Sequence, residues 1–241
     1  MPSAAIMIPA RMDSSRFPNK PLAVIAGKAM ILHVIDRCRE AELGLPIYVV
    51  TDSEEILSVV QDYGGTAILT GAHATGSDRL AEANESLNFD FVINVQGDEP
   101  VFAPSDIRIM HEFIQNSGYK VATGYTEMKD EDSPTDSNTI KTVVGVKNNL
   151  VYVSRARVPG DKGNQSVALF RQVCIYGYQK EFLALFKDLN RTPNEIVEDH
   201  ELLRFMDHEY SVGCVKMSPQ SIPVDVPSDI QLVENWLEYS R

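Results

Sequence analysis

The sequence predicts an α/β protein with a central, mostly parallel sheet and helices on both faces. Short apolar runs alternate with segments whose apolar residues recur at helical spacing, and this rhythm extends from residue 4 to about residue 95. The apolar runs are nearly continuous, as in strands that are buried on both sides. Small or polar residues follow each run, at the place where open α/β sheets bind their ligands.

Length, charge and cysteine content narrow the class of protein. The 241 residues are 44% hydrophobic and show neither a repeat nor a linker, so we expect one domain over residues 1–241. The net charge of −12 argues against a nucleic-acid partner, because phosphate contacts need clustered Lys and Arg. No run suits a membrane span or a signal peptide, so we expect a cytoplasmic protein without a membrane partner. The widely spaced Cys38, Cys174 and Cys214 are expected to be buried thiols.

Strands and helices alternate in the first hundred residues. The expected strands are the apolar runs at residues 4–8, 47–50, 66–69 and 89–95. The first helix, over residues 30–42, has apolar residues at helical spacing, namely Ile31, Val34, Ile35 and Cys38. Asp52 or Ser53 would cap the second helix, which ends at Gly64-Gly65. The third helix carries Leu80, Ala83 and Leu87.

From about Lys120 this alternation gives way to a different pattern. The expected strands here are residues 121–125, 142–146, 150–153, 174–178 and 212–216. Residues 129–138 and 160–165 are too polar to pack and are expected to be loops. The expected helices cover residues 180–188, about 194–206 and 228–239.

The loop after the first strand concentrates positive charge. It places Arg11, Arg16 and Lys20 among three prolines, which restrict the backbone and make the loop stiff. A stiff cationic loop at the carboxyl end of an α/β strand is suited to a small polyanionic ligand. Three solvated surface charges are the alternative interpretation.

Two carboxylates occupy rigid positions. Asp98 follows the apolar run that ends at Val95, and Asp225 lies between apolar residues and two prolines. Mg²⁺ prefers carboxylate and phosphate oxygens, so the two residues could share one ion with a nucleotide triphosphate if they meet in space. Asp98 could instead cap the next turn.

The chain has a second acidic feature and lacks several common nucleotide-binding and hydrolase motifs. Glu198 and Glu201 would lie one helical turn apart and form an acidic stripe, although such a stripe is more often solvated. The chain has no GxxxxGK[ST] loop, no GxGxxG after a strand and no GxSxG elbow, which argues against P-loop NTPases, dehydrogenases and α/β-hydrolases. Its histidines have no metal-binding spacing.

Several motifs together resemble one enzyme family. The longer ones are Ile8-Pro9-Ala10-Arg11 with Arg16-Phe17-Pro18-Asn19-Lys20-Pro21-Leu22, then Thr75-Gly76-Ser77-Asp78-Arg79-Leu80-Ala81-Glu82, then Asn94-Val95-Gln96-Gly97-Asp98-Glu99-Pro100. Shorter matches are Ser154-Arg155, Ile175-Tyr176-Gly177-Tyr178, Glu198, Glu201 and Val224-Asp225. In this order and number they resemble the 3-deoxy-manno-octulosonate cytidylyltransferases (CMP-Kdo synthetases), over nearly the whole chain.

The resemblance implies a fold and a reaction. The fold would be that of the Rossmann-like nucleotide-diphospho-sugar transferases, with a smaller mixed region for dimerisation, and the protein would be a homodimer. In the implied reaction, which serves lipopolysaccharide biosynthesis, the anomeric hydroxyl of an acidic octulosonate attacks the α-phosphate of CTP and releases pyrophosphate. Such a nucleotidyltransferase depends on in-line positioning and charge neutralisation more than on covalent catalysis.

The resemblance also implies roles for individual residues. Arg11, Lys20 and Asp98 would be catalytic, and Asp98 and Asp225 would hold the Mg²⁺ cofactor. The residues that hold CTP would be Arg11, Lys20, Thr75, Gly76, Arg79 and Gln96. The residues that line the octulosonate site would be Arg16, Gln96, Gln172, Tyr176, Glu198, Asp199 and Glu201.

The chain departs from the family pattern at a few positions. Gln172 replaces a usual His, Asp199-His200 replaces apolar residues, and Arg157 replaces a common Thr. A carboxylate added beside two others raises the local pKa values unless a cation neutralises it, and a substrate ammonium would do so through a charge-assisted hydrogen bond. We therefore expect 8-amino-3,8-dideoxy-manno-octulosonate as the sugar. Plain Kdo, with Asp199 facing solvent, is the alternative.

Two further functions stay open at this point. One is a cytidylyltransferase for another acidic sugar, such as a sialic acid. The other is a non-catalytic nucleotide-binding dimer. The presence of Arg11, Lys20, Asp98 and Asp225 in one chain counts against this second alternative, since a protein without activity need not keep cations and metal ligands together.

Overall fold

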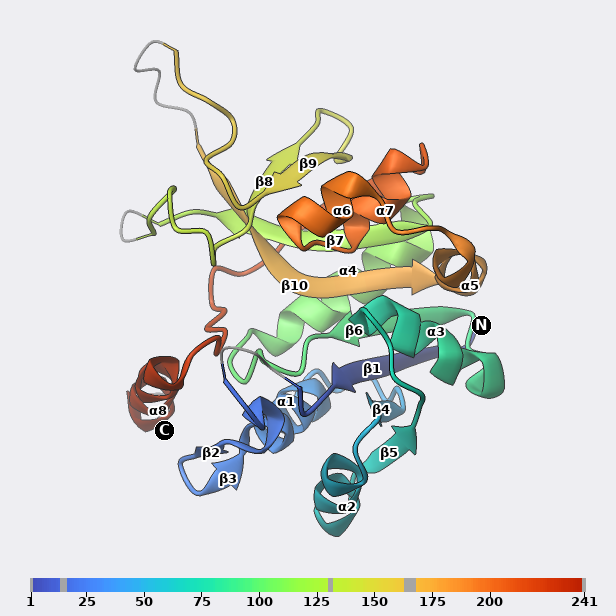
Figure 1. The fold of residues 1–241 in the computed structure, drawn as a ribbon, viewed down its shortest axis with the longest axis vertical. Coiled ribbons are helices and arrows are strands. Elements are labelled where there is room, and N and C mark those ends of the chain that lie inside the picture. Colours follow the sequence, from blue (N-terminus) through green and yellow to red (C-terminus); the bar gives the residue numbers. More distant parts are fainter. Residues whose placement is uncertain (1, 14–16, 130–131, 163–167, 240–241) are drawn as a thin grey trace.

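A nine-stranded sheet organises the computed structural model, which describes residues 2–13, 17–129, 132–162 and 168–239 (Figure 1). The main path of the sheet has the order β11-β7-β10-β6-β1-β4-β5. Its strands are β11 Val212–Lys216, β7 Val121–Glu127, β10 Phe170–Gln179, β6 Phe91–Val95, β1 Ala4–Ala10, β4 Ile47–Thr51 and β5 Thr66–Leu69. A hairpin of β8 Lys141–Val144 and β9 Leu150–Ser154 joins the sheet through β10. The short strands β2 Val24–Ile25 and β3 Lys28–Ala29 pair separately.

The sheet is mostly parallel, as the sequence predicts. β1 pairs in parallel with β4 and β6, β4 with β5, and β7 with β11, whereas β10 runs antiparallel to both of its neighbours. The start of β10 therefore lies at the edge where β1, β6 and β7 end. Residues that follow those three strands meet residues from the beginning of β10 at this edge.

Helices cover both faces of the sheet, which confirms the predicted fold class (Figure 1). On one face are α1 Met30–Arg39, α2 Glu54–Asp62 and α4 Pro104–Asn116. On the other are α3 Gly76–Leu87, α5 Lys180–Asp188 and α7 Leu202–Asp207, with α6 Pro193–Glu198 beside α7. The last helix, α8 Ile230–Tyr239, packs against Ile25 and Met30 through its Val233. In the described part of the chain, no helix is long and apolar enough to cross a membrane.

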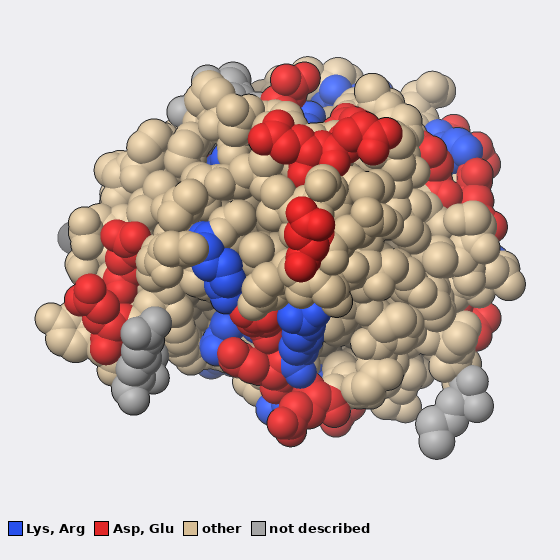
Figure 2. Space-filling model, turned by 90° about the horizontal axis from the view of Figure 1, so that it is seen from below, with Lys and Arg blue, Asp and Glu red and all other residues tan. Residues whose placement is uncertain are grey.

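The surface reflects the acidic composition. Figure 2 shows several separate groups of Asp and Glu side chains on the face that it presents. The Lys and Arg side chains visible there lie beside acidic ones and do not merge into a broad basic area. Such a face offers little attraction to a nucleic-acid backbone.

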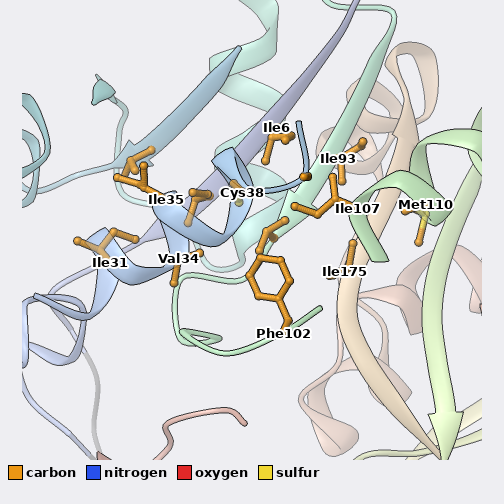
Figure 3. Packing of buried hydrophobic residues seen from close by; sticks show 14 of the residues in the cluster. Ile6, Ile31, Val34, Ile35, Cys38, Ile93, Phe102, Ile107, Met110 and Ile175 are labelled. Carbon is orange, nitrogen blue, oxygen red and sulfur yellow. The ribbon is translucent and has the colours of Figure 1, made fainter. Parts of the chain in front are cut away.

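The core follows from the alternation of side chains along the buried strands. In β1, Ile6 and Ile8 point to the α1 and α4 side, whereas Ala5 and Met7 point to the α3 side. Figure 3 shows Ile6 among apolar side chains from α1, α4, β6 and β10. Fully burying one such aliphatic side chain contributes about 2 kcal/mol, so the apolar runs explain why these segments form the centre of the sheet.

The predicted element boundaries are correct for most of the chain. Ser53 caps α2 through a hydrogen bond from the backbone N–H of Ile56, and Gly64 ends that helix region with a φ of +74°. α1 ends at Arg39, three residues earlier than predicted, and β8 ends at Val144, before Gly145 begins the hairpin turn. Cys38 and Cys214 are buried free thiols as predicted, whereas Cys174 is half-buried.

One predicted helix is wrong. Residues 194–206 form two short helices, α6 and α7, because the chain turns at Asp199, whose φ is +49°. Four consecutive polar residues, 198–201, interrupt the apolar pattern at this turn, but the pattern alone does not show that the backbone becomes left-handed there. Glu198 and Glu201 consequently do not form the predicted stripe on one helix face.

Candidate active site

Two adjoining cavities lie along the edge at which β1 and β6 end. The first has a volume of about 510 Å³ and the second a volume of about 570 Å³. Residues from the loops after β1, β5 and β6 line both cavities, together with residues that precede α8. The shared lining residues are Arg11, Thr75, Gly76, Gln96, Asp98, Asn138, Arg155, Asp199 and Asp225.

Lys20 brings the two predicted metal ligands together. Its Nζ donates to Oδ2 of Asp98 at 2.6 Å and lies 3.9 Å from Oδ1 of Asp225. The same Nζ donates to the carbonyl of Val224 at 2.9 Å, and the N–H of Val224 donates to the carbonyl of Asp98 at 2.9 Å. Segments that are far apart in the sequence therefore meet at one point beside the first cavity.

The pair of carboxylates is chemically suited to a hard divalent cation. Asp98 and Asp225 are both half-buried, with side chains 35% and 24% exposed. Across residues 2–13, 17–129, 132–162 and 168–239, no group of three or more His, Cys, Asp or Glu side chains could hold a metal by itself. Mg²⁺ usually takes one or two carboxylates together with phosphate oxygens. Asp98 and Asp225 fit an ion that is completed by a bound triphosphate.

The start of α3 forms one wall of the site. Thr75 caps the helix, since its Oγ1 accepts from the N–H of Asp78 at 3.2 Å. A Cβ on Gly76 would lie 3.2 Å from Cγ of Pro9, and a Cβ on Gly97 would lie 2.7 Å from the carbonyl oxygen of Pro9. The two glycines allow the loops after β5 and β6 to approach the end of β1 closely.

Arg79 of α3 links two loops beside the first cavity. It is 2% exposed, and its guanidinium donates to Thr70 Oγ1 at 2.6 Å, to the carbonyl of Gly71 at 3.2 Å and to Asp52 Oδ2 at 2.7 Å. These bonds join the loops after β4 and β5 to α3. Direct contact between Arg79 and a nucleotide stays a prediction.

Three of the predicted sugar-site residues line the second cavity alone: Gln172, Tyr176 and Glu201. Burial raises the pKa of the Tyr176 hydroxyl well above its usual value, so this group is a neutral hydrogen-bonding partner. Burial also raises the pKa of Glu201, although the backbone N–H of Ser77, which donates to its Oε2 at 3.0 Å, works in the opposite direction. Glu201 thereby connects the start of α7 to the start of α3.

Glu198 and Asp199 contact the same arginine. Glu198 accepts from Ser154 Oγ and from the backbone N–H of Arg155, both at 2.8 Å, and its carbonyl accepts from Arg155 Nε at 2.8 Å. Asp199 has a side chain that is 84% exposed, and its Oδ2 lies 3.4 Å from Nη2 of Arg155. The cation that the sequence argument required beside Asp199 is therefore already supplied by the chain.

The structure gathers most of the predicted site residues in one place. Lys20 and Arg79 line the first cavity, Gln172, Tyr176 and Glu201 line the second, and both cavities share the remaining predicted residues that line them. Glu198 lines neither cavity, although it contacts Arg155, which lines both. Arg16 lies outside the described residues.

Sequence reasoning assigned no role to several polar residues that line these cavities, among them His73, Asn138, Arg155 and Arg171. Arg155 belongs to the Ser154-Arg155 match, so a signal was present for it. His73 pairs with Glu82 of α3, and Arg171 lies 3.6 Å from Asp132, so both depend on contacts between separate segments. Neither has a local pattern that could have identified it.

Comparison with known proteins identifies the family. The family described as Cytidylyltransferase matches residues 5–212. The chain belongs to the cytidylyltransferase family. Among curated members, a 3-deoxy-manno-octulosonate cytidylyltransferase of Myxococcus xanthus is 36% identical over 231 residues, which cover 95% of this chain and 94% of the relative. An 8-amino-3,8-dideoxy-manno-octulosonate cytidylyltransferase of Shewanella pealeana is 37% identical over 239 residues, covering 96% and 97%.

Two solved nucleotidyltransferase structures have the same fold. A CMP:2-keto-3-deoxy-manno-octonic acid synthetase complexed with CTP superposes with a TM-score of 0.91 at 31% identity, covering 99% of this chain and 100% of that one. A putative glucose-1-phosphate thymidylyltransferase from Bacillus anthracis has a TM-score of 0.68 at 15% identity, covering 97% and 95%, and shows the shared fold alone. The Rossmann-like nucleotidyltransferase fold is thereby confirmed.

Proposed function

We propose that this cytidylyltransferase activates a 3-deoxy-octulosonate sugar acid with CTP, for lipopolysaccharide biosynthesis. The anomeric hydroxyl would form a bond to the α-phosphorus of CTP, the bond to the β-phosphate would break, and pyrophosphate would leave as the hydroxyl loses its proton. The observation that carries the proposal is the pair of adjoining cavities with Gln96, Asp98 and Asp225 in their shared wall. Two ligands bound side by side across this wall could react with each other.

The residues divide between the two ligands. The first cavity, with Lys20 and Arg11, supplies positive charge to a triphosphate, and its glycines allow close approach of the backbone. The second cavity, with Tyr176, Gln172 and Glu201, supplies hydrogen-bonding groups for a polyhydroxy acid. Asp98 and Asp225 would hold Mg²⁺, whose charge, when bound, offsets that of the phosphates during transfer. The ammonium group of Lys20 lies beside the same two carboxylates.

Within this function we propose the 8-amino sugar as substrate. The supporting observation is Asp199, a carboxylate that departs from the family pattern, lines both cavities and is 84% exposed, so that a substrate ammonium could reach it. Plain Kdo is the second candidate. It is favoured by the contact of Arg155 with Asp199, since an internal cation makes a substrate ammonium unnecessary.

Pyrophosphate release from CTP and Mg²⁺, measured with Kdo and with 8-amino-Kdo in parallel, tests both levels of the proposal. Turnover with either sugar supports the general function, and a preference for the amino sugar that disappears in Asp199→Leu supports the specific one. Equal use of both sugars, or an unchanged preference in Asp199→Leu, would refute the amino-sugar proposal. Nucleotide binding without turnover on any acidic sugar, a sialic acid included, would refute the enzymatic function.

A further inference from the structure

Two buried side chains of the second cavity, Gln172 and His200, contact each other directly, and both depart from the family pattern. Gln172 lies near the beginning of β10, and His200 lies in the turn between α6 and α7. Nε2 of His200 is 2.7 Å from Oε1 of Gln172, and each residue is 5% exposed. Both line the second cavity, next to Tyr176 and Glu201.

The surrounding hydrogen bonds define the direction of this contact. The backbone N–H of Leu202 donates to Nδ1 of His200 at 3.4 Å, so Nδ1 is an acceptor and the ring proton is assigned to Nε2. Nε2 therefore donates to Oε1 of Gln172, which leaves the Gln172 amide nitrogen to donate to Thr123 Oγ1 at 3.0 Å. The result is a neutral chain of donors from His200 to β7.

This chain of hydrogen bonds ties the helix break to the sheet. The N–H of His200 donates to the carbonyl of Glu195 at 3.1 Å, which closes α6, and its carbonyl accepts from Leu203 at 3.2 Å, which begins α7. Asp199 precedes His200 and faces the cavities, whereas Glu201 follows it and binds the start of α3. A shift of the His200 ring would move both carboxylates with respect to Tyr176.

We propose that the hydrogen bond between His200 and Gln172 positions Asp199 and Glu201 in the second cavity and so determines which sugar acid the enzyme accepts. The inference rests on the proposed function, because it assigns the second cavity to the sugar. His200 acts here as a positioning residue through Gln172 and through its two neighbours. It takes no part in the transfer itself.

Steady-state kinetics of the full-length chain provides the test. His200→Leu leaves Oε1 of Gln172 buried without a donor, so we expect KM for the sugar to rise by about tenfold, with KM for CTP within about twofold of the unaltered chain. The ratio of kcat/KM for the plain and amino sugars should change as well. His200→Gln keeps an N–H near the position of Nε2 and should hold KM for the sugar within about threefold.

A matched control separates positioning from general destabilisation. Asn84 is 4% exposed, lies on α3 outside both cavities and exchanges two hydrogen bonds of 3.0 Å with the backbone of Phe89. Asn84→Ala should lower Tm without changing KM for the sugar. If Asn84→Ala raised that KM as much as His200→Leu does, the effect would be one of stability and the proposal would fail.

A double-mutant cycle tests whether the two residues act through one contact. Gln172→Met alone should raise KM for the sugar by about tenfold, and adding His200→Leu to it should raise KM no further, because both changes remove the same hydrogen bond. Independent, multiplying effects would refute the pairing. An unaltered chain that turns over octulosonate while all variants keep its KM values would refute this inference and leave the proposed function intact. No turnover by the unaltered chain on any sugar would refute both.

Discussion

Asp98 and Asp225 are the residues on which the proposed metal chemistry depends. Asp98→Asn keeps the shape of the side chain but removes a negative charge from the pair beside Lys20. We expect a loss of about 100-fold or more in kcat/KM, together with a higher Mg²⁺ requirement, because one of two carboxylate ligands is weakened. Pyrophosphate release over a Mg²⁺ titration measures the first effect, and calorimetry of CTP binding with and without Mg²⁺ measures the second.

The control for this prediction is Asp188→Asn, an exposed carboxylate at the end of α5 that lines neither cavity. It makes the same change in charge and should leave both readouts unaltered. If Asp98→Asn retained the Mg²⁺ requirement of the unaltered chain, Asp98 would not be a metal ligand.

His200 should also make stability depend on pH. Burial, with a smaller contribution from Arg155, lowers the pKa of His200 to about 3 in the folded chain, whereas an unfolded histidine titrates near pH 6.5. Between these values the unfolded state binds the extra proton, so the free energy of unfolding falls as the pH decreases. From pH 7 to pH 5 the unaltered chain should lose about 2 kcal/mol more than His200→Gln. Urea unfolding at both pH values measures this difference, and equal losses in the two proteins would contradict it.

At the level of single residues, the sequence predicted several side chains of the candidate site, but it did not predict which residues they contact. Asp98 could be found because it directly follows a buried strand, whose carboxyl end is a predictable ligand site. The bond between Gln172 and His200 spans 28 residues and depends on how α6 and α7 dock on β10. Local patterns hold no information about such docking, so both residues could be noticed only as departures from a family pattern.

Among the elements, the pair α6 and α7 depends on one buried arginine. Arg204 is 2% exposed and donates from Nε and Nη2 to the two carboxylate oxygens of Glu195 at 2.9 and 2.7 Å. Its Nη1 donates to Asp78 of α3 at 3.0 Å and to the carbonyl of Phe186 of α5 at 3.1 Å. One guanidinium therefore connects four helices on this face of the sheet.

Replacing this arginine should strongly destabilise the fold. Arg204→Met leaves the Glu195 carboxylate, 1% exposed, without its bidentate partner, and we expect the free energy of unfolding to fall by about 3–5 kcal/mol. Arg191 lies 3.0 Å from the same carboxylate but is 42% exposed. Arg191→Met should therefore cost less than about 1 kcal/mol. Chemical denaturation of both variants measures the two losses in the free energy of unfolding. Equal losses would show that the burial of the arginine does not determine how much its contact with Glu195 stabilises the fold.

Most elements were predictable from the sequence, whereas no residue range was predicted for α4 and the helix expected over residues 194–206 is broken. Near-continuous apolar runs located the buried strands β1 and β6, the largely buried β4, and also β5, an edge strand with exposed residues at both ends. The break at Asp199 lies in a polar stretch, residues 198–201, which interrupts the apolar pattern but does not by itself distinguish a turn from the polar side of a helix. The tertiary contacts of Glu201 and Arg204 stabilise that break, and they come from segments more than a hundred residues away.

At the scale of the whole molecule, four exposed apolar side chains lie on β9, on α6 and in the turn between β8 and β9. Large apolar side chains are exposed there, at Val146, Val151, Ile196 and Val197, with Val197 80% exposed. The contact of Glu198 at the end of α6 with Ser154 of β9 places α6 beside the hairpin. We propose that a second copy of the chain covers this surface, as the predicted homodimer requires, because apolar side chains gathered on adjacent elements mark association surfaces.

The proposed homodimer predicts a mass in solution of about twice the 26.8 kDa of one chain, which light scattering coupled to size-exclusion chromatography measures. Val197→Asp places a charge among the exposed apolar side chains of α6 and should shift the population toward the single chain, because an unpaired charge is costly to bury between subunits. Val24→Asp is the control, since Val24 is 65% exposed but lies on the β2–β3 hairpin, away from β8 and β9 in Figure 1. Dissociation by Val24→Asp and not by Val197→Asp would place the interface elsewhere, and a mass of one chain for the unaltered protein would refute the homodimer.

Since Glu198 and Arg155 connect the α6 surface to the cavities, a dissociated Val197→Asp chain with lower sugar turnover would show that assembly and catalysis are coupled through this contact.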